Sequence, residues 1–428
     1  MLRRAKERAV RALRWTERYT KTDMVYFAES NFWLNISRVL SVGTGMLLTI
    51  AFANLLSPEV FGMYKYVIAA AGFVASLSLS GLGTALMRAV AQGSRAIIPS
   101  IVRTANLWSL PASAAALGVS IYYFAQGNSD LGFAFLFIAA TNSFSNGLGA
   151  TKGVLQAAGD FKTAMIIGIP RILVPFVIIL LAILFTENVV WILFAYFSSH
   201  LLTSWIGYRW TLRRLRISAT SSTDSSETVK YGTQLTGLSF FQLAGGYLDQ
   251  LLLWHFTDPA TLAIYAIALS PVKEASNLLN NFPAIFFPKV AVKTKAEVYA
   301  TLPLRLWQMF IASGLTTLLY IVLVPFLFAL LFPQYLASIV VSQVLALTLL
   351  LQPRGLIDVF FITHGEIHKR YATILGSQAL KLGLFFILIP LYGLWGAVAA
   401  TVVAEVGAMV FYLIAYKRSA KADAKAGE

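Results

Sequence analysis

Charged and amide side chains lie inside long apolar segments of this chain, at spacings of three or four residues that place them on one face of a helix. Arg and Lys at such positions can bind phosphate groups through charge-assisted hydrogen bonds, and Asp or Glu can bind a cation. Ionised groups in apolar surroundings are costly unless they have a partner or water. The candidate cavity residues are Asn35, Arg38, Arg171, Asp249, Lys273, Glu274 and Asn277.

The segments around these candidates are apolar enough to form membrane-spanning helices. The chain is 58% hydrophobic and only 12% charged, a composition that a water-soluble core does not need. A bilayer core of roughly 30 Å requires about 20 apolar residues per helix. Such runs are predicted at 32–54, 64–86, 100–125, 131–150, 163–186, 188–208, 233–256, 260–287, 303–332, 338–362, 371–391 and 393–416. The sequence therefore predicts an all-α polytopic membrane protein with about twelve transmembrane helices.

Basic residues between these runs fall almost entirely on one side of the membrane. Lys and Arg fill the N-terminal segment, the even-numbered breaks and the tail, whereas the odd-numbered breaks contain only Lys65. The positive-inside rule then predicts that both termini are cytoplasmic, in a multi-pass protein of the plasma membrane. The net charge of +15 is mainly this topology signal, and no basic domain is large enough to indicate nucleic-acid binding.

A weak internal repeat accompanies the only substantial polar linker, which runs from 209 to 230. The stretch at 57–64 parallels that at 258–265, and the stretch at 159–162 parallels that at 365–369. Two matches in the same order indicate two related six-helix halves. An even number of helices keeps both halves in one orientation, so a pseudo-twofold axis along the membrane normal is predicted.

We expect five parts along the chain, beginning with a basic arm. They are a basic amphipathic cytoplasmic arm at 1–22, an N-terminal six-helix lobe at 23–209, a cytoplasmic linker at 210–232, a C-terminal six-helix lobe at 233–416 and a cytoplasmic tail at 417–428. The basic face of the arm can lie on anionic inner-leaflet lipids. A solvated arm that only fixes the orientation is the alternative.

Polar stripes on the first, seventh and eighth predicted helices favour a water-filled cavity shared by the two halves, because a lipid-facing stripe is very unfavourable. Interhelical hydrogen bonding that only holds the bundle together is the alternative. Lys273 lies near the midplane, where snorkelling is difficult, whereas Arg38 and Arg171 lie near enough to the cytoplasmic end to snorkel. The stripes lean basic, which suits an anionic substrate with phosphate or diphosphate groups.

Four further ionisable residues in the second half favour a structural interpretation. Arg354 and Asp358 are four residues apart on one predicted helix and are expected to pair there. Lys381 and Glu405 are expected to pair between the last two helices. These pairs would hold helices together without binding substrate.

No catalytic constellation is recognisable. The chain has no cysteine, so it lacks disulfides, thiolate metal ligands and a cysteine nucleophile. His364 and His368 share a helix face but have no obvious third metal ligand. No phosphate-binding loop of the kind found in ATPases is present. We therefore expect no enzymatic activity, no metal and no cofactor.

The chain resembles the polysaccharide transporter, or oligosaccharide flippase, family, within the superfamily that also holds multidrug-and-toxin exporters and lipid II flippases. The stretches that carry the resemblance are NISR at 35–38, LLSPEVFGMY at 55–64, GLGTALMR at 81–88, Asp249 with IYAIA at 264–268, and GLWGAVAA at 393–400. The likeness covers essentially the whole chain. Each motif is degenerate, so the resemblance rests on the order and spacing of the motifs.

The resemblance implies two six-helix lobes, alternating access, and movement of a polyprenyl-diphosphate-linked oligosaccharide from the inner to the outer leaflet for cell-surface polysaccharide biosynthesis. It also implies that Arg38, Asp249 and Lys273 are cavity residues. The chain lacks the two extra C-terminal helices of the lipid II flippases, which makes lipid II a less favoured cargo.

Two alternatives to this interpretation come from the residues. A cation-coupled multidrug-type exporter would use Asp249, Glu274 and Glu405 as coupling carboxylates. A membrane glycosyltransferase or polymerase would be expected to show a long outer loop or an acidic metal-binding motif, and neither is found.

Overall fold

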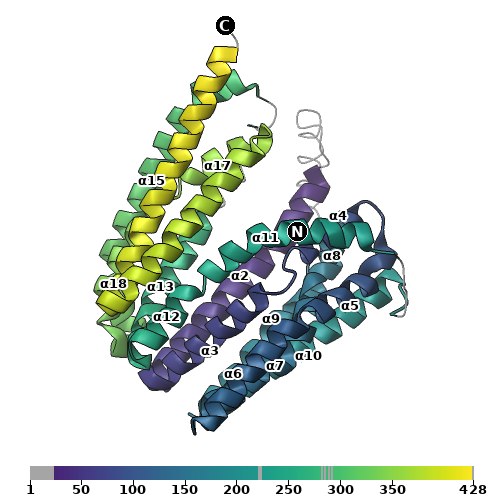
Figure 1. Cartoon of the computed structure of the whole chain (residues 1–428), viewed down its shortest axis with the longest axis vertical. Coiled ribbons are helices and arrows are strands. Elements are labelled where there is room, and N and C mark those ends of the chain that lie inside the picture. The colour runs from purple at the N-terminus through teal and green to yellow at the C-terminus, as the bar shows by residue number, and fades with distance from the viewer. Residues whose placement is uncertain are drawn as a thin grey trace, which may run out of the picture.

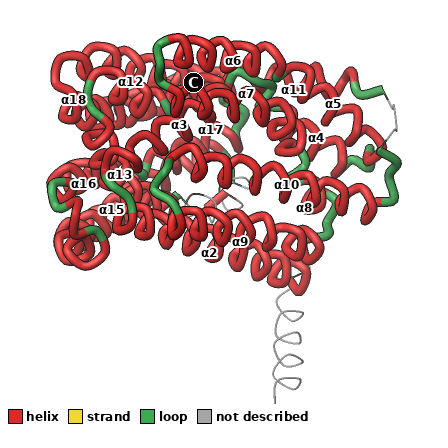
Figure 2. The backbone as a smooth tube through the Cα atoms, turned by 90° about the horizontal axis from the view of Figure 1, so that it is seen from below, coloured by secondary structure: helices red, strands yellow, loops and turns green. Residues whose placement is uncertain are grey.

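The computed structural model describes residues 24–219, 224–280, 283, 286–287, 290 and 293–426, and this part of the chain consists of helices and their connections, without strands (Figure 2). The helices of the first half are α2 (Met24–Leu55), α3 (Pro58–Ser76), α4 (Leu82–Ala91), α5 (Ile98–Trp108), α6 (Leu110–Ala125), α7 (Ser129–Ala150), α8 (Val154–Ala157), α9 (Phe161–Phe185) and α10 (Val189–Leu215). Those of the second half are α11 (Ser226–Gly245), α12 (Leu248–Phe256), α13 (Pro259–Leu279), α15 (Lys295–Leu331), α16 (Ser338–Ala346), α17 (Arg354–Thr363) and α18 (Ile367–Ala426). The predicted arm at 1–22 lies outside the described residues.

Helices lie at all twelve predicted spans, so the all-α polytopic prediction is confirmed. Within the described residues, eight helices are long and apolar enough to cross a bilayer by length and composition alone. The predicted second, seventh and eighth spans are not among these eight. The second is broken between α3 and α4, the seventh is broken at Gly246 between α11 and α12, and the eighth carries the polar stripe of α13.

The long helix α18 contains the last two predicted spans, which fold back on each other at Gly393. This residue has φ 54° and ψ −124°, a backbone conformation that only glycine adopts readily. Lys369 Nζ lies 2.8 Å from Ser419 Oγ, and a Cβ on Gly376 would contact the ring of Phe411. The two arms of α18 are therefore antiparallel neighbours.

The two stretches of the sequence repeat have matching local structure. Ser57 and Asp258 are N-cap residues whose side chains accept from the backbone amides of Val60 and Thr261, each before a proline at the first helical position. This arrangement starts α3 and α13 at equivalent places because proline lacks the amide that a helix leaves unpaired there. In the second pair of stretches, Gly159 and Gly365 have φ of 80° and 73°.

Helices of the two halves meet through α3 and α13, which lie between the α15–α17–α18 group and the α5–α7–α9–α10 group (Figure 1). Gly62 packs so closely on the carbonyl group of Pro259 that no Cβ fits there. Nearby, the rings of Phe61 and Tyr335 are 6.4 Å apart, and Asn54 Nδ2 donates to the carbonyl oxygen of Leu331 at 2.8 Å. These contacts lie at helix ends predicted to face outward, so the halves are joined tightly at that side.

A second contact between the halves lies at the predicted cytoplasmic side, where α11 packs against α4. The guanidinium of Arg88 lies 4.6 Å from the centre of the Tyr231 ring, and the backbone amide of Gly81 donates to Thr236 Oγ1 at 3.1 Å. α11 therefore follows the linker in sequence but packs on a helix of the first half.

Candidate functional site

The predicted polar stripes of α2 and α13 face each other. Arg38 Nη2 donates to the backbone carbonyl of Asn277 at 3.2 Å, and the side chains of Asn35, Lys273 and Asn277 are exposed. Glu274 Oε2 accepts from Asn277 Nδ2 at 3.5 Å, a long contact beside the same stripe. Five of the seven candidate residues therefore line or flank the junction between the halves.

The sequence predicts that Lys65 lies in an outer loop. In the structure it lies at this junction instead. It lies in α3, two turns after Pro58, and is half-buried with Nζ 5.1 Å from the centre of the Phe61 ring. α3 packs against α13, the helix that carries Lys273, and neither lysine has an ion-pair partner among the described residues. We name Arg38, Lys65 and Lys273 the basic seam. The signal that could have located Lys65 is the Ser57-Pro58 helix start.

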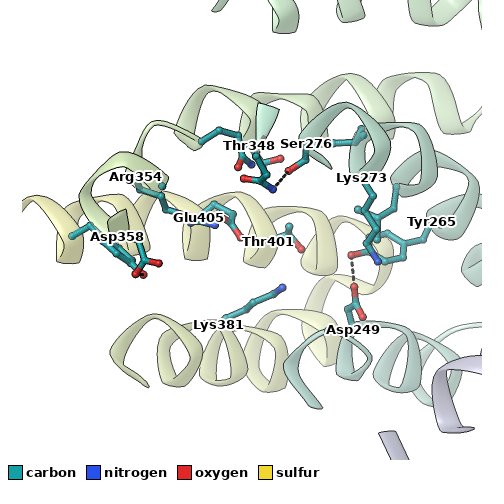
Figure 3. Close-up of a pocket in the computed structure, with 17 residues that line it drawn as sticks. Asp249, Tyr265, Lys273, Ser276, Thr348, Arg354, Asp358, Lys381, Thr401 and Glu405 are labelled. Carbon is teal, nitrogen blue, oxygen red and sulfur yellow. Dashed lines mark hydrogen bonds and ion pairs between the residues drawn. The ribbon is translucent and has the colours of Figure 1, made fainter. Parts of the chain in front are cut away.

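Asp249 lies beside this seam, in a cavity of about 330 Å³ formed by helices of the second half (Figure 3). The residue is 4% exposed, and its carboxylate accepts from the buried hydroxyl of Tyr265 at 2.8 Å and from the backbone amide of Gln250. Lys273 of the basic seam also lines this cavity. The carboxylate thus has two neutral donors and shares its cavity with a lysine.

The ion pairs in that cavity differ from the expected ones. Arg354 pairs with Glu405 of α18, not with Asp358. Asp358 instead accepts from Arg370 at 2.8 Å and from Tyr412 at 3.3 Å. The same-helix pairing was wrong because α17 packs on both arms of α18, whose charged residues approach Arg354 and Asp358 from the side.

Lys381 is not paired with Glu405, because Arg354 takes that position. Its Nζ lies 5.4 Å from the centre of the Phe385 ring, and the side chain lines the Asp249 cavity (Figure 3). An ammonium over an aromatic face gains cation–π stabilisation. Lys381 is therefore a second cation in the cavity that contains Asp249.

Arg171 belongs to a third place, the wall of the first half. Its Nη2 donates to Ser204 Oγ at 3.3 Å, and its side chain packs against Gly207 on α10. The structure therefore distributes the predicted residues over the junction, the Asp249 cavity that shares Lys273 with it, and this wall.

Metal ligands do not gather in any part of the chain that the structure describes, where no group of three His, Cys, Asp or Glu residues could hold an ion. The sites have exposed bases, amides and hydroxyls. Such groups are suited to hydrogen bonds and ion pairs with a polar or charged molecule.

Comparison with known proteins gives a family match and several similar folds. Residues 27–292 match the family model described as polysaccharide biosynthesis protein. No curated protein matches the sequence.

Three solved structures share the fold over most of the chain. An inward-facing multidrug resistance MATE family transporter of the MOP superfamily is 17% identical, with 91% of this chain and 98% of that chain covered and a TM-score of 0.62. The lipid II flippase MurJ in an inward closed conformation is 11% identical, with 91% and 87% covered and a TM-score of 0.70. A MOP superfamily transporter from Pyrococcus furiosus is 16% identical, with 91% and 95% covered and a TM-score of 0.56. The shared fold is the two-lobe, twelve-helix architecture of these transporters.

Proposed function

Because this chain belongs to the family of polysaccharide biosynthesis proteins, we propose that it is a flippase that moves a polyprenyl-diphosphate-linked oligosaccharide from the inner to the outer leaflet of the plasma membrane by alternating access. The coarser function, a multi-pass membrane transporter of the MOP superfamily, is the one that its family and fold support directly. The identity of the substrate, the membrane in which the protein lies and the direction of transport are what we propose here.

The basic seam is the observation that carries the proposal. Lys65 of the first half and Lys273 of the second lie on the packed helices α3 and α13 at the junction, and Arg38 lies on the adjoining stripe. Bringing like charges together in a low-dielectric setting is costly unless an anion lies between them. A diphosphate has the charge and the acceptor oxygens to bridge such cations. Binding of a diphosphate would therefore favour a conformation in which the two halves lie close together.

Alternating access follows from where the halves touch. In this proposal the Gly62–Pro259 contact is the closure of the predicted outer side, and the α11–α4 contact at the predicted cytoplasmic side would part to admit substrate. Opening the Gly62–Pro259 contact while the cytoplasmic ends approach would expose the basic seam to the outer leaflet. Under the positive-inside rule both termini remain cytoplasmic, and the arm at 1–22 would bind anionic inner-leaflet lipids.

A cation-coupled multidrug-type exporter is the second candidate, and the Asp249–Tyr265 contact favours it. A buried carboxylate held by a neutral hydroxyl can take up and release a proton or another cation. Organic cations, however, would meet the Arg and Lys of the basic seam at the junction. The flippase therefore has the stronger physical support.

Leaflet translocation in proteoliposomes tests the proposal. A fluorescent polyprenyl-diphosphate oligosaccharide is scored for outer-leaflet accessibility with wild type, Arg38→Ala, Lys273→Ala and the exposed control Lys162→Ala. We expect transport by wild type and the control, and loss of transport in the two seam variants with folding intact. Absence of lipid movement together with proton-driven, Asp249-dependent efflux of organic cations would establish the exporter instead.

A further inference from the structure

A polar cavity in the first half has a composition unlike that of the basic seam. It measures about 350 Å³ and is lined by α3, α7 and α10, with Tyr247 entering from the break between α11 and α12. Its polar lining residues include Thr141, Asn142, Ser145, Asn146, Lys152 and His200. We name it the N-lobe cavity.

Amide and hydroxyl groups of the N-lobe cavity are held in a fixed arrangement. Asn142 Nδ2 donates to Ser113 Oγ at 3.1 Å, and Asn146 Nδ2 donates to Asn142 Oδ1 at 2.8 Å. These bonds use the amide hydrogens, and they leave the Asn146 carbonyl oxygen available as an acceptor. A preorganised set of amide and hydroxyl groups is suited to a ligand rich in hydroxyl groups.

Aromatic rings form another wall of the same cavity. Tyr196 stacks on His200 with ring centres 4.4 Å apart. Tyr247 reaches the cavity over Gly72, where any Cβ would collide with its ring. Flat aromatic faces beside hydroxyl-binding groups match the two surfaces of a sugar ring, its apolar C–H face and its polar edge.

The charge of the cavity is positive without a compensating carboxylate. Lys152 lines it, Arg171 donates to Ser204 of its lining, and no Asp or Glu is among its lining residues. His200 donates through Nδ1 to the carbonyl oxygen of Tyr196 at 3.0 Å, which fixes the ring and leaves Nε2 as an acceptor for a sugar hydroxyl. A neutral sugar would not need the ammonium of Lys152, whereas a sugar carboxylate would pair with it.

The cavity also lies at the right place for the glycan of a lipid-linked substrate. Ile68 and Gly72 line it on α3, three and seven residues beyond Lys65. These spacings share one helix face with Lys65, and Gly72 is about 10 Å farther along the axis. A diphosphate at the basic seam would therefore have its first sugars beside the N-lobe cavity.

We propose that the N-lobe cavity is a glycan subsite that binds an acidic sugar, such as a uronic acid, through Lys152. The inference rests on the proposed flippase function for the attached lipid. It adds the chemical class of the glycan, which the family does not specify.

Binding to the full-length protein in nanodiscs tests the subsite with three probes: farnesyl diphosphate, its glucosyl derivative and its glucuronosyl derivative. A charge-assisted hydrogen bond contributes about 1.5–3 kcal/mol, so we expect the glucuronosyl probe to bind at least about tenfold more tightly than the glucosyl probe. Lys152→Gln and Ser145→Asp should each remove most of this preference without changing the Kd of farnesyl diphosphate, and the control Lys162→Gln should keep it. Equal affinity of the two sugar probes for wild type would overturn the proposal.

A second measurement does not depend on the diphosphate. The chain has no native cysteine, so Ser145→Cys places a unique thiol in the cavity. Methyl glucuronoside should slow its labelling by a thiol reagent, methyl glucoside should not, and Lys152→Gln should abolish the protection. If neither glycoside protects, the subsite is wrong even when farnesyl diphosphate binds through the basic seam. If farnesyl diphosphate fails to bind while glucuronoside protects, the diphosphate part of the proposed function is wrong.

Discussion

Gly62 of α3 lies against the carbonyl group of Pro259 of α13, where the two halves of the molecule are in direct contact. Each residue belongs to one of the repeated stretches, so equivalent helix starts from the two halves meet at this contact. The absence of a side chain at Gly62 permits the approach. We propose that this contact is the closure of the predicted outer side.

Gly62→Val should open this closure. The added side chain would collide with the backbone of α13, and backbone cannot move aside as a flexible side chain can. In a Ser276→Cys background, we expect faster labelling by a membrane-impermeant thiol reagent added outside. Gly118→Val is the matched control because open space surrounds Gly118. Unchanged outer labelling of Gly62→Val would contradict the assignment of this contact as the closure.

Lys65→Met should weaken the binding of farnesyl diphosphate. Removing one cation of the basic seam removes a charge-assisted contact, which corresponds to a rise in Kd of at least about tenfold. Lys65→Arg should restore most of the affinity, and the exposed Lys162→Met should have no effect. The measurement is isothermal titration in nanodiscs, and an unaltered Kd for Lys65→Met would remove Lys65 from the site.

The Arg354–Glu405 pair should show strong coupling in a double-mutant cycle. Its side chains are 26% and 21% exposed, and loss of one partner leaves the other charge largely desolvated. Arg354→Met and Glu405→Met should each lower the thermal midpoint in detergent, while the double variant should recover much of the loss. A coupling free energy on the order of 1–3 kcal/mol is expected. Simple additivity of the two losses would show that the residues act independently.

Glu366→Gln should reduce stability at neutral pH and lose its effect in acid. Burial raises the pKa of the Glu366 carboxyl, but hydrogen bonds and charges from Lys295 and Lys369 outweigh burial and hold the pKa below its ordinary value of 4.5. A lowered folded-state pKa gives stability above pH 4.5 that is lost as the pH falls through the folded value.

Thermal midpoints of wild type and Glu366→Gln should thus differ at pH 7 and converge below pH 4.5. Glu187→Gln, an exposed position outside the described ion pairs, should match wild type at both values. A difference between wild type and Glu366→Gln that persists in acid would mean that the glutamate acts through packing.

The sequence determined the fold class, the helix positions and the family. Apolar length is a local property that a bilayer of fixed thickness selects, so the twelve predicted spans coincide with helices. Ser57-Pro58 and Asp258-Pro259 predicted the two equivalent helix starts because capping depends on neighbouring residues alone. The order of the degenerate motifs identified the family that the match over 27–292 confirms. Site assignments and domain boundaries stay predictions.

Only the tertiary structure decided which charges meet. Arg354 pairs with Glu405 across helices, and Lys65 and Lys273 lie on the packed helices α3 and α13 although 208 positions separate them in the sequence. Helical spacing gives the face on which a residue lies but not the helix that packs against that face. For the same reason Lys152 was interpreted only as a topology signal, whereas the packing of α3, α7 and α10 places it in the N-lobe cavity.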